Sequence, residues 1–263
     1  MKKKIFSILL IFAIQHLYSQ TQKVKNAEGE WLIVNIKPEE ALEKALEEAK
    51  KDALRKAGVS ERIKSTQSIS AKESNKGSSE MFSMFSSIEM NGAVTEYDIK
   101  KSETEKSKID GLLYAKVIID ATVKKYSTQS DSEFKIDVTG LRTTYRNEEA
   151  ITFSVLPNKS GYLRIFLFED NLIDAELLFP TKEEPDNKLI EKKSVKFPIS
   201  SKVEYSVEKI TSEEQEHNLL LFVYTKRDVP FYGKVSRQRV LNWINDMEPD
   251  EREVVMKAVI ITE

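Results

Sequence analysis

The chain contains no cysteine and only two histidines among its 263 residues. Without cysteine there is no disulfide bond, no thiol nucleophile and no lipid-modified cysteine. His16 lies in an apolar N-terminal stretch and His217 lies among acidic residues, where we expect a turn over 213–217. Thiolate and imidazole ligands for zinc are therefore nearly absent. We expect no metal, no cofactor and no catalytic activity.

Glycine is scarce as well, with eight residues in the chain. Neither of the glycine-rich phosphate-binding patterns, G-x-G-x-x-G and G-x-x-x-x-G-K-[ST], occurs in the sequence. The 41 basic residues do not exceed the 43 acidic ones, so the chain lacks the basic excess on which nucleic-acid binding depends. The sequence predicts neither a nucleotide site nor a nucleic-acid partner.

Long apolar runs are missing too, and none approaches the roughly 20 residues of a membrane-spanning helix. The longest run, Ile5 to Ile14, follows three lysines and precedes the small residue Ser19. A charged start and a short apolar stretch are typical of a secretory signal. We expect a signal peptide over residues 1–19 and an exported chain, located in the periplasm or cell envelope, without a transmembrane segment.

The remaining first half predicts a helix packed on an antiparallel sheet over residues 28–126, after a polar lead-in over 21–30. Pro38 favours the first turn of a helix and Gly58 favours its end, and alanine recurs every fourth residue from Ala41 to Ala57. Strands are expected over 31–36, 93–99 and 112–124, and in the last of them alternate residues are apolar. Trp31 is expected in the core.

The second half predicts a β-sandwich over residues 132–263, after a polar linker over 127–132. Its centre is a hairpin over 160–180, in which the strand from Tyr162 to Phe168 is apolar on both faces and therefore interior to its sheet. Gly161 suits a turn or a close backbone approach. Further strands are expected over 134–141, 150–156, 203–207, 218–225 and 254–261, with a helix over 237–247 capped by Ser236. The fold class is α+β, with a C-terminal helix and strand.

Two family resemblances accompany these patterns. Gly-Tyr-Leu at 161–163, Leu-Phe-Pro at 178–180, Asn187 and Phe-Pro-Ile at 197–199 resemble domain-of-unknown-function family 4384, a β-sandwich domain of bacterial envelope and signalling proteins. The chain departs from that pattern at Thr181, where the family has Asn, and at 197–198, where an Ile is missing. Residues 28–125 are similar to the amino-terminal domain of flagellar assembly protein T and to related exported lipoproteins. The second resemblance implies a periplasmic α/β domain that makes assembly contacts, and the first implies no known activity.

One short segment is a candidate contact site. Its apolar residues stand at positions 81, 84, 85 and 88, the spacing of one helix face, and flexible Met-rich surfaces adapt to partners. That face is covered either by its own domain or by another protein. The possible contact residues are Met81, Phe82, Met84 and Phe85.

A calcium site is a weaker candidate. Four residues after the central strand have side-chain oxygens that could bind calcium, but they lack the twelve-residue loop pattern and are expected to form a turn. These residues are Asp170, Asn171, Asp174 and Glu176.

The sequence thus predicts a non-enzymatic, exported interaction or assembly module whose partners are other envelope proteins. Two alternatives stay open. The sandwich loops could bind an envelope glycan or another small ligand, or two carboxylates brought together by the fold could form a hydrolase site. The oligomeric state does not follow from the sequence.

Overall fold

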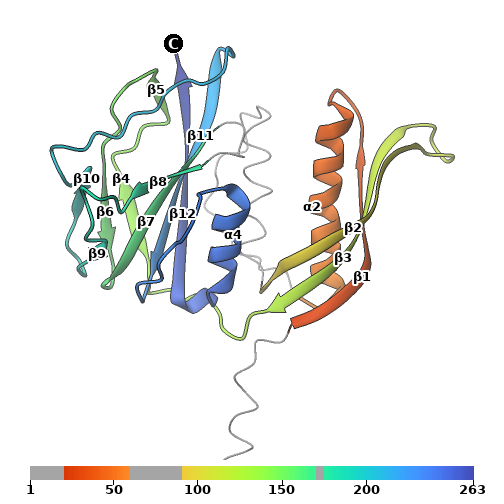
Figure 1. The fold of residues 1–263 in the computed structure, drawn as a ribbon, viewed down its shortest axis with the longest axis horizontal. Helices are drawn as coiled ribbons and strands as arrows, with labels where there is room; N and C mark the ends of the chain where they lie inside the picture. The colour runs from red at the N-terminus through yellow and green to blue at the C-terminus, as the bar shows by residue number, and fades with distance from the viewer. Residues whose placement is uncertain (1–20, 60–90, 170–174) are drawn as a thin grey trace, which may run out of the picture. The chain divides into compact units, whose positions relative to one another are not determined.

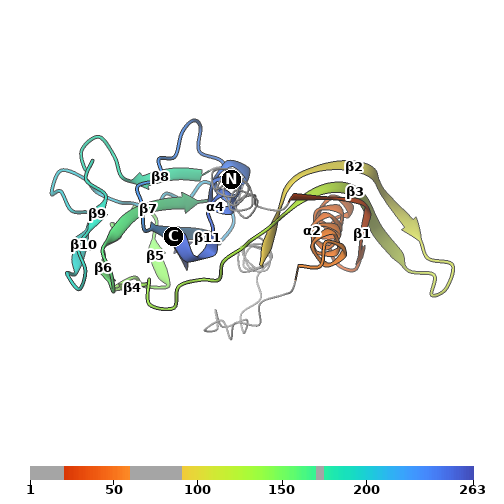
Figure 2. The ribbon, with the colours of Figure 1, turned by 90° about the horizontal axis from the view of Figure 1, so that it is seen from below.

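The computed structural model describes residues 21–59, 91–169 and 175–263 (Figures 1 and 2). Within these residues the chain is mixed α+β and mostly sheet, with two α-helices and twelve strands in three sheets. The described residues form two compact units. The N-terminal unit contains residues 21–59 and 91–127, and the C-terminal unit contains residues 128–169 and 175–263.

The N-terminal unit is a three-stranded antiparallel sheet, in the order β1-β3-β2, with one helix packed on it. Its elements are β1 (Thr21–Leu32), α2 (Pro38–Lys56), β2 (Gly92–Lys106) and β3 (Leu113–Lys125). The helix ends as expected, with Gly58 at a φ of +75°, the left-handed conformation that glycine adopts without strain. Every second residue of β3 from Ala115 to Val123 is buried, as its alternating pattern predicts.

Helix α2 lies unusually close to β1. The buried face of the helix is a stripe of alanines at 41, 45, 49 and 53, all with no exposed surface. Opposite them β1 carries Gly29, where an added Cβ would lie 1.9 Å from the carbonyl oxygen of Ala45. Small residues on both elements therefore bring helix and strand backbones together.

Four expectations for this unit are wrong. The first strand ends at Leu32 rather than at residue 36. Residues 21–30 are not a loose lead-in but most of β1, and β2 continues to Lys106 rather than ending at 99. Both segments are held by backbone pairing with β3, which does not require an apolar pattern of their own side chains. Trp31 is 39% exposed rather than in the core, and Lys44 lies over its ring at 5.6 Å.

The C-terminal unit has two sheets that share one core. The smaller sheet has the order β10-β6-β4, and the larger has the order β5-β12-β11-β7-β8, with β9 pairing to β7. The strands are β4 (Ile136–Thr139), β5 (Thr144–Arg146), β6 (Phe153–Pro157), β7 (Gly161–Phe168), β8 (Ala175–Phe179), β9 (Lys188–Leu189), β10 (Val195–Phe197), β11 (Gln215–Thr225) and β12 (Arg252–Thr262). The helices are α4 (Arg237–Asp246) and the 3-10 turn η2 (Pro249–Glu251).

Strand β7 is interior to the larger sheet and buried on both faces, as predicted. One face, with Leu163 and Ile165, packs against the smaller sheet. The other face, with Phe166 and Phe168, packs against α4. At Gly161 an added Cβ would lie 2.7 Å from the Tyr224 ring, which confirms the close approach expected there.

Three further expectations for this unit are corrected by the fold. Residues 203–207 form no strand, and their β-bridge pairs Ser206 with Ala150. His217 lies within β11, opposite Ile260, and not in a turn. Helix α4 begins after Ser236 as expected, but the Ser236 side chain makes no capping hydrogen bond.

Candidate functional site

The predicted contact segment cannot be placed. Met81, Phe82, Met84 and Phe85 lie outside the described residues, so their role stays a prediction. Of the possible calcium ligands only Glu176 is described, and it is exposed on β8. Among the described residues there is no group of three or more His, Cys, Asp or Glu side chains that could hold a metal ion.

Glu184 is one of two glutamates buried within the C-terminal unit, and both of its oxygens are occupied. Oε1 accepts from the Ser200 amide at 2.6 Å and Oε2 accepts from the Tyr205 hydroxyl at 2.8 Å. Burial, and then the bond to Glu184, raises the pKa of the Tyr205 phenol above its usual range. The carboxylate thus anchors the 198–205 segment to the sandwich, which is a structural role.

A second buried polar group is Arg164 on β7, which is only 5% exposed. Its Nη2 donates to Asp228 Oδ1 at 2.7 Å, and its guanidinium lies 5.7 Å from the centre of the Trp243 ring. The hydrogen bond from Arg164 lowers the pKa of the Asp228 carboxyl, and Asn187 donates to the same oxygen at 3.4 Å. These contacts tie the segment after β11 to the face of the sheet that α4 covers.

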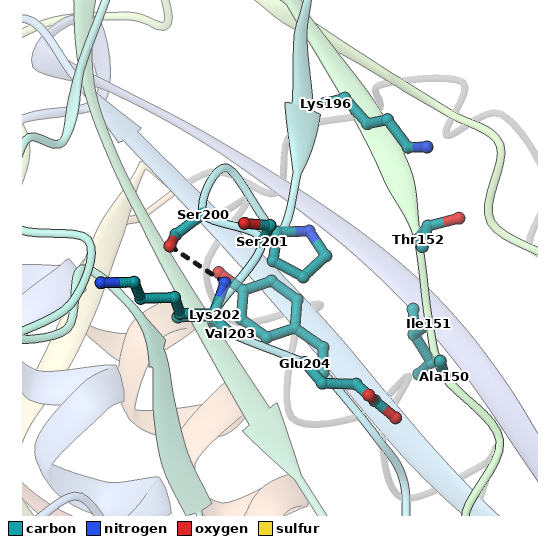
Figure 3. Close-up of a pocket in the computed structure, with 11 residues that line it drawn as sticks. Ala150, Ile151, Thr152, Lys196, Ser200, Ser201, Lys202, Val203 and Glu204 are labelled. Atoms are coloured by element: carbon teal, nitrogen blue, oxygen red, sulfur yellow. Dashed lines mark hydrogen bonds between the residues drawn. The ribbon is translucent and has the colours of Figure 1, made fainter.

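A hollow of about 310 Å³ opens beside the smaller sheet (Figure 3). It lies between residues 150–152, which lead into β6, and residues 196–205, which include the end of β10. Its lining includes Ile151, Pro198, Val203 and Tyr205. We call this feature the edge hollow. Its polar lining residues are Thr152, Lys196, Ser200, Ser201, Lys202 and Glu204.

The N-terminal unit carries an exposed apolar surface at the end of the β2–β3 hairpin. Figure 2 shows this hairpin curving past α2. Ile109, at its tip, is 99% exposed, and Leu112 and Leu113 are also exposed. The Ile33 amide donates to the Leu113 carbonyl at 2.9 Å, which places the residues after β1 beside the hairpin. We call the exposed set the distal apolar end: Trp31, Val34, Ile109, Leu112 and Leu113.

The hairpin tip is a well-ordered turn. The Ser107 amide donates to the Leu112 carbonyl at 2.8 Å, and the Gly111 amide donates to the Ser107 carbonyl at 3.0 Å. Asp110 accepts from the Leu112 amide at 3.0 Å and from the Tyr114 hydroxyl at 2.9 Å. These bonds lower the pKa of the Asp110 carboxyl, because they favour its charged form. The turn therefore holds Ile109 in a defined position in water.

Two comparisons with known proteins found no match. No protein-family model matches the chain, and no curated protein is significantly similar to it. The two family resemblances therefore stay predictions. Among the described residues, no helix is both long and apolar enough to cross a membrane.

Sequence reasoning missed both the distal apolar end and the edge hollow. A signal for the first was available, because Ile109 stands in the turn sequence Ser-Lys-Ile-Asp-Gly, where an isoleucine has no local role. The edge hollow had no such signal, since its two sides are more than forty residues apart in the chain.

Proposed function

We propose that this protein is a non-enzymatic interaction module of the cell envelope, exported by a signal peptide over residues 1–19, and that its distal apolar end binds another envelope protein. The observation that carries this proposal is the ordered hairpin tip with Ile109 fully exposed. Burying one such side chain contributes about 1.5–3 kcal/mol to association. Because the turn is already ordered, little conformational entropy is lost when it binds.

The position of the distal apolar end favours a contact. Thr21 pairs with Lys124 and Gly92 pairs with Lys125, so the described chain segments enter and leave the N-terminal unit at one end of the sheet. Leu32 pairs with Tyr114 and Lys106 pairs with Leu113 at the opposite end. The apolar residues therefore lie at the end of the sheet opposite the points where these described segments begin and end.

The charges around the tip favour a protein over a lipid surface. Lys106 and Lys108 are balanced by Glu105 and Asp110, so the tip lacks the basic cluster that draws a segment to anionic lipid. An apolar centre with charged residues of both signs around it is the usual anatomy of a protein interface.

A photo-cross-linking residue at position 109 of the full chain, expressed in its native cells, tests the proposal. We expect a discrete adduct with one envelope protein, lost when Leu112 and Leu113 are both replaced by Ser. The matched control carries the same probe at Ile190, a half-exposed isoleucine of the C-terminal unit, where no such adduct should form. Ile109→Ser should change stability by less than about 0.5 kcal/mol, because the side chain is exposed.

Two results would overturn the proposal. One is equal cross-linking from positions 109 and 190, which would mean that the tip makes only random encounters. The other is an adduct formed only with a second copy of this chain, which would make the distal apolar end a self-association surface.

A further inference from the structure

Five of the polar side chains around the edge hollow are unpaired, whereas Ser200 Oγ accepts a hydrogen bond from the Lys202 amide. Through their side chains, Thr152, Lys196, Ser201, Lys202 and Glu204 make no hydrogen bond or ion pair with the described part of the chain. Many other charged side chains of the C-terminal unit are paired: Arg142 with Glu149, Lys159 with Glu133, Lys226 with Asp131 and Arg227 with Glu251. The edge hollow therefore presents five side chains whose hydrogen-bonding groups are available to an occupant.

Hydrogen bonds hold the 200–205 segment, which forms one wall of the edge hollow, in a fixed conformation. Glu184 holds the Ser200 amide and the Tyr205 hydroxyl, as described above. Within the turn, the Lys202 amide donates to Ser200 Oγ at 3.2 Å and the Val203 amide donates to the Ser200 carbonyl at 3.1 Å. Pre-ordered walls reduce the entropy lost when a ligand binds.

Lys196 and Glu204 are the charged groups that best define the ligand. In Figure 3 Lys196 and Thr152 lie on one side of the hollow and Glu204 lies on another, while Lys202 extends away from them. An occupant must therefore accept hydrogen bonds from an ammonium and donate them to a carboxylate. Hydroxyl groups do both, and they also match Thr152 and Ser201.

A zwitterionic amino acid could also pair with the Lys196 ammonium and the Glu204 carboxylate, but its affinity would then depend on ion pairs. Lys196 and Glu204 are exposed, and ion pairs between exposed groups are weak because water screens them. A neutral polyhydroxyl ligand needs no such pairing, and the half-buried Pro198 and Val203 offer apolar surface to the C–H face of a ring. A volume of about 310 Å³ is at the small end of ligand sites, which suits a single sugar ring.

We propose that the edge hollow binds one sugar residue, with Glu204 accepting from ligand hydroxyls, and Lys196 and Thr152 donating to them. This site shares no residue with the distal apolar end, so either proposal can fail without the other. The site is open and its polar groups are in contact with water, so we expect a dissociation constant on the order of 1 mM.

The test uses the full mature chain, labelled with ¹⁵N, and titrations with D-glucose, D-galactose and N-acetyl-D-glucosamine up to about 20 mM, a range that covers millimolar affinity. We expect amide shifts for at least one sugar, confined to residues 150–152 and 196–205. Glu204→Gln and Lys196→Met should each weaken binding about fivefold, the effect of one lost hydrogen bond. The matched controls Glu213→Gln and Lys193→Met change exposed residues outside the hollow and should leave binding unchanged.

Titration with a trisaccharide of the sugar that binds then distinguishes two possible ligands, an internal residue of a glycan chain and a free sugar or chain end. Tighter binding than that of the monosaccharide indicates a glycan chain, and equal binding indicates a free sugar or a chain end, and both results agree with the proposal. The proposal is overturned if no sugar shifts these amides, if the Glu204 and Lys196 variants bind as well as the controls, or if glycine binds more tightly than every sugar.

Discussion

Replacement of Gly29 by alanine should destabilise the N-terminal unit strongly. The added Cβ would lie 1.9 Å from Ala45 O and 2.3 Å from Ala49 N, whereas ordinary van der Waals contact begins at 3.4 Å. The helix would have to move away by about 1.5 Å, which would loosen the alanine stripe along its length. Overpacking of this kind costs about 3 kcal/mol, the upper part of the usual range. For a unit of this size, the loss corresponds to a fall in Tm of roughly 12–24 °C.

Tryptophan fluorescence can follow this unit alone. The chain has two tryptophans, so a Trp243→Phe background leaves Trp31 as the reporter of the N-terminal unit. Lys23→Ala, on the same strand but exposed, is the control and should shift Tm by only a few degrees. Adding Ala45→Gly should not rescue Gly29→Ala, because the atom that clashes is a main-chain oxygen. If the Gly29→Ala variant had the same Tm as the Lys23→Ala control, the close approach of helix and strand would be refuted.

Three further predictions concern other parts of the chain. Phe222 is fully buried, and its ring meets the Phe153 ring edge-to-face at a centroid distance of 5.3 Å. Replacing Phe222 with Ala should lower the free energy of unfolding, measured in urea, by about 3–5 kcal/mol, whereas replacing exposed Tyr232 with Ala should lower it by less than about 0.5 kcal/mol. Similar losses at the two positions would mean that the core is misplaced. The Lys226 ammonium, 2.9 Å away, lowers the pKa of Asp131 to about 2, so its stabilising contribution is present above about pH 4 and is lost as the pH falls towards 2. The stability difference between the natural chain and Asp131→Asn should therefore shrink over that range, and a difference that does not change with pH would contradict the ion pair. Finally, the intact mass of protein from its native compartment should lack the first 19 or 20 residues, and retention of Met1 on envelope material would refute export.

Elements with a strong local pattern could be predicted from the sequence. Helix α2 follows from its alanine repeat between Pro38 and Gly58, and α4 follows from Val240 and Ile244 on one helical face. Strand β7 could be placed inside a sheet because both of its faces are apolar. In each case the residues that become buried recur along the sequence with the period of the element, 3.6 residues for a helix and 2 for a strand.

Strands β1 and β5 could not be predicted from the pattern of their own residues. The polar residues 21–30 form a strand only because β3 supplies backbone partners, and β5 exists because β12 runs parallel beside it. Backbone hydrogen bonds do not depend on side-chain type, so such pairing leaves little pattern to read.

The two candidate sites also depend on tertiary structure. The edge hollow is lined by Thr152, Lys196 and Glu204, which are far apart in the sequence. Ile109 is a candidate contact residue because the folded unit leaves it exposed. Composition and periodicity determined the fold class and the elements that build the cores. Only the packing of distant segments decided which polar groups stay unpaired and which apolar groups stay exposed, because both outcomes depend on neighbours that are remote in the chain.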